Sequence, residues 1–411
     1  MIEFKSFYLD NGLQVIVHED TNVQTAVINL LYDVGSKDED SELTGFAHLF
    51  EHLMFGGSKH IQNFDEELQR AGGENNAFTS PDITNYYMTL PPQNLETGFW
   101  LESDRMLSLS FDPKVLEVQR SVVMEEFKQR YLNQPYGDLW LNLRPLAYKK
   151  HPYQWATIGK DISHIEKVTM NDVESFFHKH YAPDNACLVV AGNVTYEEVK
   201  RLSEKWFGEI PASKRGRRNL SKEPDQTERR TATLEGKVPQ DSFTMAFKTP
   251  GKFEPAYYAS DLVSDVLGRD KSSRLHTKLV RDEKLFTNIN AYITGSNDPG
   301  LLVISGKVSQ GVDINNAEKG VNEVINSMVS GISEEELHKV KNQAESALIF
   351  SDMEVLNRAM RLATASLSGN VNLVNEEAAK INAVSLDDIN EQAKAILDIN
   401  KANVLYYHSE N

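Results

Sequence analysis

The sequence predicts an α+β protein built from two similar lobes joined by a linker. Segments of strand and helix character alternate along the chain, a polar and charged stretch lies near its midpoint, and a helix–strand pattern recurs after that stretch. A chain of 411 residues is long enough for two or three domains. Its composition, 40% hydrophobic and 25% charged, is ordinary for a globular protein. We place the lobes at residues 1–212 and 231–411, with the linker at 213–230.

The first lobe is expected to begin with strands and continue with helices. The Asn11-Gly12 pair predicts a turn that divides the segment 7–19 into two strands. The β-branched and aliphatic residues of 25–35 predict a further strand. Apolar residues at helical spacing then predict a helix at 43–54. The later segments follow the same two patterns. Strands are expected at 25–35, 74–91 and 185–194, and helices at 94–110, 113–132 and 171–182.

An internal duplication is indicated on either side of the linker. Residues 168–173 align with 384–389 at an offset of 216, and the same offset places 186–190 on 402–406. The matches are mostly by residue class and cover only these two patches. Recurrence of a helix start and a strand in the same order predicts two copies of one unit.

Charge and cysteine content exclude several classes of protein. Lys and Arg number 43 against 60 Asp and Glu, and a net charge of −17 repels phosphate backbones, so nucleic acid is not an expected partner. Cys187 is the only cysteine; it lies in an apolar run and is expected to be buried. No run approaches the ~20 apolar residues of a membrane span, and no signal peptide is visible. We expect a cytoplasmic protein, unless a leader has been removed.

A candidate metal motif lies in the predicted helix 43–54. His48 and His52 are four residues apart, with Glu51 beside the second histidine. Side chains at this spacing share one helical face, about 5–6 Å apart at Cβ, so both imidazoles can bind one zinc ion. The order HxxEH is the inverzincin signature. The alternative is an amphipathic helix with solvated histidines.

A catalytic zinc also needs a third protein ligand and an open position for water. Val122 and Val123 place Glu126 on the apolar stripe of the helix 113–132, where a carboxylate needs a cation. Glu125 turns more toward solvent. The preference for Glu126 is mild, and the helix offers three candidates: Glu117, Glu125 and Glu126.

Together these residues resemble the pitrilysin (M16) family of zinc peptidases, especially the short-chain branch that includes mitochondrial processing peptidase. The resemblance covers nearly the whole chain, including TGFAHLFEHLMFGGS, NNAFTSPDITNYYMTLP, DNACLVVAGNV and DPGLLVISGKV. It implies the LuxS/MPP-like metallohydrolase fold, with a mostly antiparallel sheet and packed helices in each lobe, and dimers that close like a clamshell around a chamber. It makes His48, His52 and Glu126 the ligands of one zinc per chain and Glu51 the general base. Manganese or cobalt could occupy the same ligands.

The resemblance also assigns a substrate-binding strand. Asn75, Asn76, Ala77 and Phe78 match the family's edge strand, along which a peptide substrate lies as an added β-strand. Backbone hydrogen bonds bind any extended peptide and leave selectivity to side-chain pockets. The alternative is an ordinary strand of the sheet.

Two positions depart from the family pattern. Gln119 stands seven residues before Glu126, where the family usually has a second glutamate; it can support the site by hydrogen bonding but adds no charge. Arg281 matches the family's substrate-binding arginine, but Asn288 stands where a tyrosine normally completes the pair. We therefore hypothesise a two-chain enzyme whose partner supplies the arginine and tyrosine; the alternative is a homodimer.

The predicted reaction is zinc-dependent hydrolysis of oligopeptides or unfolded segments. Zinc supplies a Lewis acid, while Glu51 takes the proton of the attacking water and passes it to the leaving amine. The alternative from another class is a non-catalytic structural subunit. The intact metal motif argues against that alternative, and Gln119 and Asn288 argue slightly for it.

Overall fold

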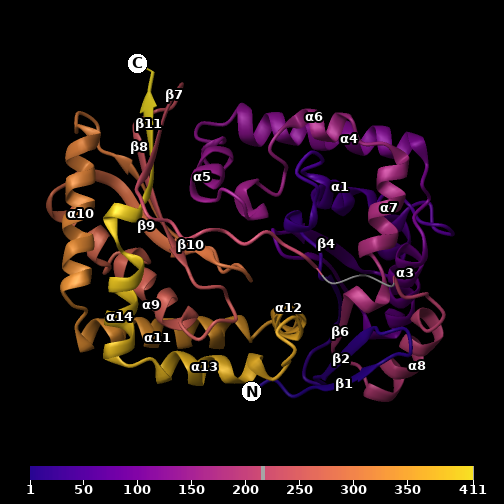
Figure 1. Ribbon diagram of the computed structural model, residues 1–411. Helices are drawn as coiled ribbons and strands as arrows, with labels where there is room; N and C mark the ends of the chain where they lie inside the picture. Colours follow the sequence, from indigo (N-terminus) through magenta and orange to yellow (C-terminus); the bar gives the residue numbers. More distant parts are fainter. Residues whose placement is uncertain (214–217, 411) are drawn as a thin grey trace. The chain divides into compact units, whose positions relative to one another are not determined.

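Figure 1 shows the computed structural model of the chain, which describes residues 1–213 and 218–410. Residue contacts divide the chain into two compact units. The first unit consists of Met1–Lys128, Trp155–Ser221 and Ile349–Glu376. The second consists of Gln129–Gln154, Lys222–Leu348 and Glu377–Asn411. The two-lobed α+β fold expected from the sequence is confirmed.

These units are not the continuous lobes 1–212 and 231–411, because each half of the chain gives one segment to the other unit. Helix α5 (Leu139–Ala147) comes from the first half and buries Leu143 against the second sheet. Helix α12 (Val355–Ser366) comes from the second half and buries Leu362 against the first sheet, where Figure 1 shows it beside β6 (Ala186–Gly192). Burial of these apolar stripes moves the unit boundaries away from the expected positions.

The predicted linker at 213–230 lies only partly within the described residues, because 214–217 fall outside them. Its described part is not free of contacts. Arg218 forms ion pairs with Asp38 at 2.7 Å and Asp33 at 3.0 Å, both in the first unit. The chain passes to the second unit after Ser221.

The first sheet has six strands in the order β1-β2-β6-β3-β5-β4. Only β2 and β6 run parallel, and every other pair is antiparallel. One face is covered by α12, and the other contacts α3 (Leu95–Leu107) through residues such as Ile28. Burial on both faces explains the unbroken apolar runs in the central strands. The strands are β1 (Lys5–Tyr8), β2 (Gln14–Glu19), β3 (Ala26–Tyr32), β4 (Glu74–Thr79), β5 (Thr84–Leu90) and β6 (Ala186–Gly192).

The predicted helices of the first half are present, with shorter ends. The helix expected at 113–132 is α4 (Pro113–Phe127), followed by a π-helical turn. Asp112 caps α4 by accepting the Lys114 N–H, and Pro113 occupies the first turn, where it loses no hydrogen bond. Besides α4 and α12, the first unit contains the helices α1 (Phe46–Leu53), α2 (Phe64–Arg70), α3 (Leu95–Leu107), α6 (Ile162–Glu166), α7 (Met170–His180) and α8 (Tyr196–Phe207).

The second sheet repeats the topology of the first. Its order is β7-β11-β8-β10-β9, with only β7 and β11 parallel, which matches β2-β6-β3-β5-β4 strand for strand. The strands are β7 (Arg230–Gly236), β8 (Ser242–Thr249), β9 (Phe286–Ile293), β10 (Gly300–Val308) and β11 (Asn403–Ser409). The remaining helices of the chain are α9 (Tyr257–Gly268), α10 (Ile314–Ser330), α11 (Glu334–Ser351), α13 (Leu373–Ala383) and α14 (Leu386–Ile396).

The duplication indicated by the sequence is visible in a helix, turn and strand that recur in both lobes. Helices α7 and α14 both have 11 residues, and both begin with a capping box, Thr169 with Asp172 and Ser385 with Asp388. A short 3₁₀ turn and then a strand follow each helix, β6 in one lobe and β11 in the other. The same sequence offset therefore relates equivalent structural elements.

The burial of Cys187 and the hydrophobic length of the helices were also considered in the sequence predictions. Cys187 is free and buried, as predicted, and burial raises the pKa of its thiol to about 12. Among the described residues, every helix is too short or too polar to cross a membrane.

Candidate active site

The three motif residues share one face of helix α1. Leu49, Phe50 and Leu53 are buried and pack into the core. Because side chains on opposite faces of a helix point apart, His48, Glu51 and His52 occupy the half-buried face. The apolar residues of the motif thus orient its polar ones.

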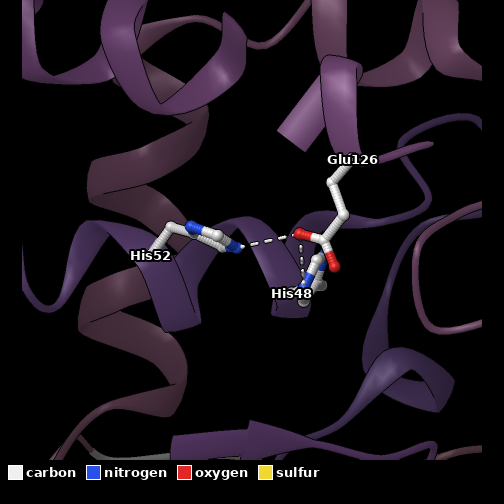
Figure 2. Close-up of side chains that lie close together, drawn as sticks. All are labelled: His48, His52 and Glu126. Atoms are coloured by element: carbon white, nitrogen blue, oxygen red, sulfur yellow. Dashed lines mark ion pairs between the residues drawn. The ribbon is translucent and has the colours of Figure 1, made fainter. Parts of the chain in front are cut away.

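His48 and His52 converge on Glu126 of helix α4, as Figure 2 shows. The His48 Nε2 atom lies 3.7 Å from Glu126 Oε2, and His52 Nε2 lies 3.4 Å from the same oxygen. One ligand atom from each residue lies within 4.8 Å of the other two. Within residues 1–213 and 218–410, this is the one group of three or more His, Cys, Asp or Glu side chains with such spacing.

This donor set fits zinc. Catalytic zinc sites commonly combine imidazole nitrogens with a carboxylate oxygen and leave a fourth position open. Ligand atoms at ~2.0–2.1 Å from a tetrahedral ion lie roughly 3.3 Å from one another, close to the distances between the glutamate oxygen and the two imidazoles. The three side chains keep 13%, 24% and 17% of their surface exposed for His48, His52 and Glu126, so solvent reaches the donors.

The other two glutamates of helix α4 point elsewhere. Glu125 is 59% exposed and pairs with Lys128 at 2.5 Å, and Glu117 is 67% exposed and pairs with Arg120. The buried face beside Glu126 is formed by Val123 and Phe127. The prediction that Val122 belongs to the apolar stripe with Glu126 was wrong, because Val122 is 44% exposed and lies outside that face.

Glu51 is held by a residue that sequence reasoning missed. The hydroxyl of Thr79 donates a hydrogen bond of 2.6 Å to Glu51 Oε2. Thr79 ends strand β4, in which half-buried and exposed residues alternate. Because side chains two residues apart point to the same face, Thr79 shares its face with Asn75 and Ala77. The alternation of side chains along this predicted strand was the sequence feature that could have identified Thr79.

Strand β4 forms one edge of the first sheet, as expected for a substrate-binding strand. Asn76 and Phe78 are exposed, whereas Asn75 and Ala77 are half-buried. The Asn75 amide donates to Asp65 Oδ1 at 2.8 Å. The Ala77 N–H donates to Asn76 Oδ1 at 2.8 Å, so a peptide adding at this edge would compete with the Asn76 side chain.

The remaining predicted site residues belong to helix α4 and to the second unit. Gln119 is half-buried on α4, two turns before Glu126, and makes no hydrogen bond to the three donors in the described part of the chain. Arg281 belongs to the second unit, is 64% exposed and pairs with Asp282 at 2.8 Å. Asn288, on β9, accepts the Lys307 N–H at 3.2 Å beside a register shift between β9 and β10.

Two family models match the chain. Residues 14–159, which contain the motif and Glu126, match Insulinase (Peptidase family M16). Residues 167–344 match the Peptidase M16 inactive domain. The second match agrees with the lack of an HxxEH motif in that part of the sequence.

Most of the chain aligns with relatives that are named as zinc proteases or as a processing peptidase. Zinc protease PqqE of Helicobacter pylori is 31% identical over 351 residues, which span 82% of this chain and 77% of the relative. The uncharacterized zinc protease YmxG of Bacillus subtilis is 26% identical over 99% of both chains. A probable mitochondrial-processing peptidase subunit beta of Arabidopsis thaliana is 22% identical over 90% of this chain and 74% of its own.

Solved structures agree with the sequence matches. A protease from Helicobacter pylori superposes with a TM-score of 0.93 at 26% identity, covering 99% of this chain and 100% of that one. Pitrilysin has the same fold over 100% of this chain and 45% of its own, with a TM-score of 0.81 at 18% identity. These matches confirm the resemblance noted from the motifs, and the chain belongs to the M16 family of peptidases.

Proposed function

We propose that the protein is a zinc-dependent endopeptidase that uses Glu51 as its general base. One observation carries this proposal: two imidazoles and a carboxylate from α1 and α4 converge, and Glu51 stands on the same helix within reach of the edge strand. Relatives named zinc proteases support it.

Each residue of the site then has a defined task. His48, His52 and Glu126 would hold the ion through Nε2, Nε2 and a carboxylate oxygen. Zinc, when bound, supplies a Lewis acid and lowers the pKa of water toward ~7. The Glu51 carboxylate accepts the proton of the attacking water and delivers it to the leaving amine nitrogen. Thr79 fixes the orientation of that carboxylate through its hydrogen bond to Oε2.

Strand β4 is the proposed binding site for the peptide backbone. An extended peptide would pair with its open edge beside Asn76 and Phe78, and the Asn76 side chain would release the Ala77 N–H to a substrate carbonyl. Phe78 is 39% exposed and offers an apolar surface to a substrate side chain. Pairing of this kind requires an extended segment, so oligopeptides and unfolded regions are the proposed substrates.

The active form is proposed to be a dimer that closes around a chamber, with a second M16-like chain supplying an arginine and a tyrosine. Asn288 has no phenolic hydroxyl, and its side chain already accepts the Lys307 N–H. Arg281 pairs with its neighbour Asp282. A homodimer of this chain with full peptidase activity would contradict the two-chain hypothesis.

The test is hydrolysis of a quenched fluorescent peptide library by the purified chain with added zinc. Glu51→Gln should retain zinc and lose roughly 10²–10⁴ in rate, because it removes the base and none of the donors. Glu125→Gln is the matched control, since it makes the same chemical change on an exposed face of α4. Near-normal turnover of Glu51→Gln would refute the base assignment.

The same experiment separates the catalytic and structural hypotheses. If the chain binds zinc but does not hydrolyse peptides, the assay is repeated with a second M16-like chain from the same source. Activity of the mixture that depends on Glu51 would support the two-chain enzyme. A mixture without turnover would favour the non-catalytic subunit.

A further inference from the structure

The N-terminus of helix α1 is held by a buried carboxylate that the proposed chemistry does not use. Glu39 is 8% exposed. Its Oε2 atom accepts the Gly45 N–H at 2.9 Å, and its Oε1 atom accepts the Ala47 N–H at 2.8 Å. The first N–H groups of a helix have no partner within the helix. Gly45, at the N-cap position, has no side chain to accept them, so Glu39 takes that role from outside the helix.

The electrostatics of Glu39 are unusual for a buried acid. In the described residues no Lys, Arg or His forms an ion pair with it. The N–H groups of Ala47 and Gly45, and to a smaller extent the Trp155 side chain, favour its charged form. Burial raises the pKa of Glu39 well above its usual range, and the N–H groups of Ala47 and Gly45 oppose that shift. A buried carboxyl group is costly unless its oxygens are hydrogen-bonded, so this side chain is tied closely to the first turn of α1.

The loop around this contact has little freedom. Gly45 has a φ of +86°, and a Cβ atom there would lie 2.4 Å from the Ile158 carbonyl oxygen. The Thr44 N–H donates to His164 Nδ1 at 3.1 Å, and Thr44 Oγ1 accepts the Lys160 N–H at 2.9 Å. The loop that leads into α1 is therefore fixed at Thr44 and Gly45, and Glu39 adds two hydrogen bonds to the first turn that follows.

The first turn of α1 is also where the metal donors begin. Ala47 directly precedes His48, and the helix has only eight residues. A shift of its first turn would move the whole motif relative to Glu126, which comes from another helix. Ligand atoms must lie within about 0.2 Å of their preferred distances to bind a metal well.

We propose that Glu39 is a positioning residue for the metal centre: its two hydrogen bonds set the rotation and height of α1 so that both histidines face Glu126. The inference rests on the proposed zinc site. It predicts that Glu39 controls metal affinity without touching the metal, the substrate or the reacting atoms.

The experiment measures metal binding by the full chain rather than turnover. Glu39→Gln keeps the size of the side chain, but its amide offers one oxygen acceptor and turns an NH₂ group toward the other N–H. We expect zinc affinity, measured by competition with a chromophoric chelator, to fall about 10-fold or more. The d–d absorption of the Co²⁺-loaded variant should also change, because it reports ligand geometry.

Asp20→Asn is the matched control. Asp20 belongs to the same unit, is 12% exposed in its side chain and pairs with Arg358 at 2.8 Å, at the end of the sheet that α12 covers. This variant loses a half-buried charge pair and should keep the zinc affinity and the Co²⁺ spectrum of the wild type. Circular dichroism of each protein establishes that the measured variants are folded.

The outcomes separate the inference from the proposed function. Zinc binding by Glu39→Gln within twofold of the wild type, with an unchanged Co²⁺ spectrum, would overturn the inference alone, as would an equal loss in Asp20→Asn. Failure of the wild type to bind zinc would overturn the proposed function. If Glu39→Gln does not fold, Glu39→Asp replaces it; its shorter side chain cannot keep both bonds, and wild-type zinc affinity in that variant would contradict the inference.

Discussion

Helices α1 and α9 follow equivalent central strands, β3 and β8, in two sheets of the same topology, yet they differ in chemistry. Helix α1 presents two imidazoles and a carboxylate on a half-buried face. Helix α9 is buried over nearly all of its length and carries Asp261 and Asp265. No group of metal donors occurs in the second unit within the residues that the structure describes. A duplicated scaffold therefore does not duplicate a site, because the site depends on which side chains one helix exposes.

Because, among the described residues, metal donors gather at α1 and not at α9, we expect the largest loss of zinc binding and activity when a donor of the first lobe is replaced. His48→Ala should abolish stoichiometric zinc binding and peptide hydrolysis, because only two donors remain. Asp261→Asn, at the equivalent helix, should leave zinc content unchanged. Atomic emission of the dialysed proteins measures both. Unaltered zinc in His48→Ala, or zinc loss in Asp261→Asn, would break the distinction between the two helices.

Helices α5 and α12, which each half of the chain gives to the other unit, allow the stabilities of the two units to be compared. Leu362→Ala should destabilise the first unit by about 2–5 kcal/mol, although Leu362 comes from the second half of the chain, because it leaves a cavity against the first sheet. Leu143→Ala should do the same for the second unit. Urea unfolding followed by zinc release reports the first unit.

The control for these core changes is Val122→Ala, which is 44% exposed on α4 and should change stability by less than about 0.5 kcal/mol. If Leu143→Ala, rather than Leu362→Ala, shifted the transition that releases zinc, the assignment of α12 to the first unit would be wrong.

The edge strand of the first lobe should contribute a smaller effect on catalysis. Thr79→Val removes the hydrogen bond to Glu51, and we expect roughly a 10-fold lower kcat with little change in KM or zinc content. Thr79→Ser keeps the hydroxyl and should recover most of the rate. Steady-state kinetics on a single fluorogenic peptide measures both. Equal losses in the two variants would show that the hydrogen bond from the hydroxyl does not by itself explain the effect, because Thr79→Ser retains that hydroxyl.

The smallest effect is expected from the acidic helix of the second lobe. Burial, and next the nearby Asp265, raise the pKa of Asp261 from its usual 3.8 to about 7. The folded state therefore binds a proton that the unfolded chain releases, and this contribution to stability, full below pH about 4, is lost as the pH rises to about 7.

Asp261→Asn should flatten that dependence and raise stability at pH 8 by on the order of 1 kcal/mol. Melting temperatures between pH 5 and 8 measure it. Asp387→Asn, an exposed position on α14, is the control. A wild-type pH dependence in Asp261→Asn would show that other groups cause it.

Local features of the fold were predictable from the sequence because they depend on short-range patterns. The helix expected at 43–54 is α1 at Phe46–Leu53, and the one expected at 171–182 is α7 at Met170–His180. The duplication was visible because equivalent helix starts keep the same capping chemistry. The predicted ends of helices were less accurate. In α4 the α-helix ends at Phe127 and a π-helical turn follows.

The sequence alone determined which residues could form a metal site. Spacing of four places His48 and His52 on one face, and the family motifs singled out Glu51 and Glu126, all before any fold was known. Only the tertiary structure decided which glutamate of α4 reaches the histidines, that Thr79 holds Glu51, and that Glu39 caps α1. These contacts join residues 6 to 78 positions apart, and the placement of α5 and α12 in the opposite units joins still more distant ones. Residue type and periodicity describe one segment at a time, whereas long-range pairing depends on how all segments pack.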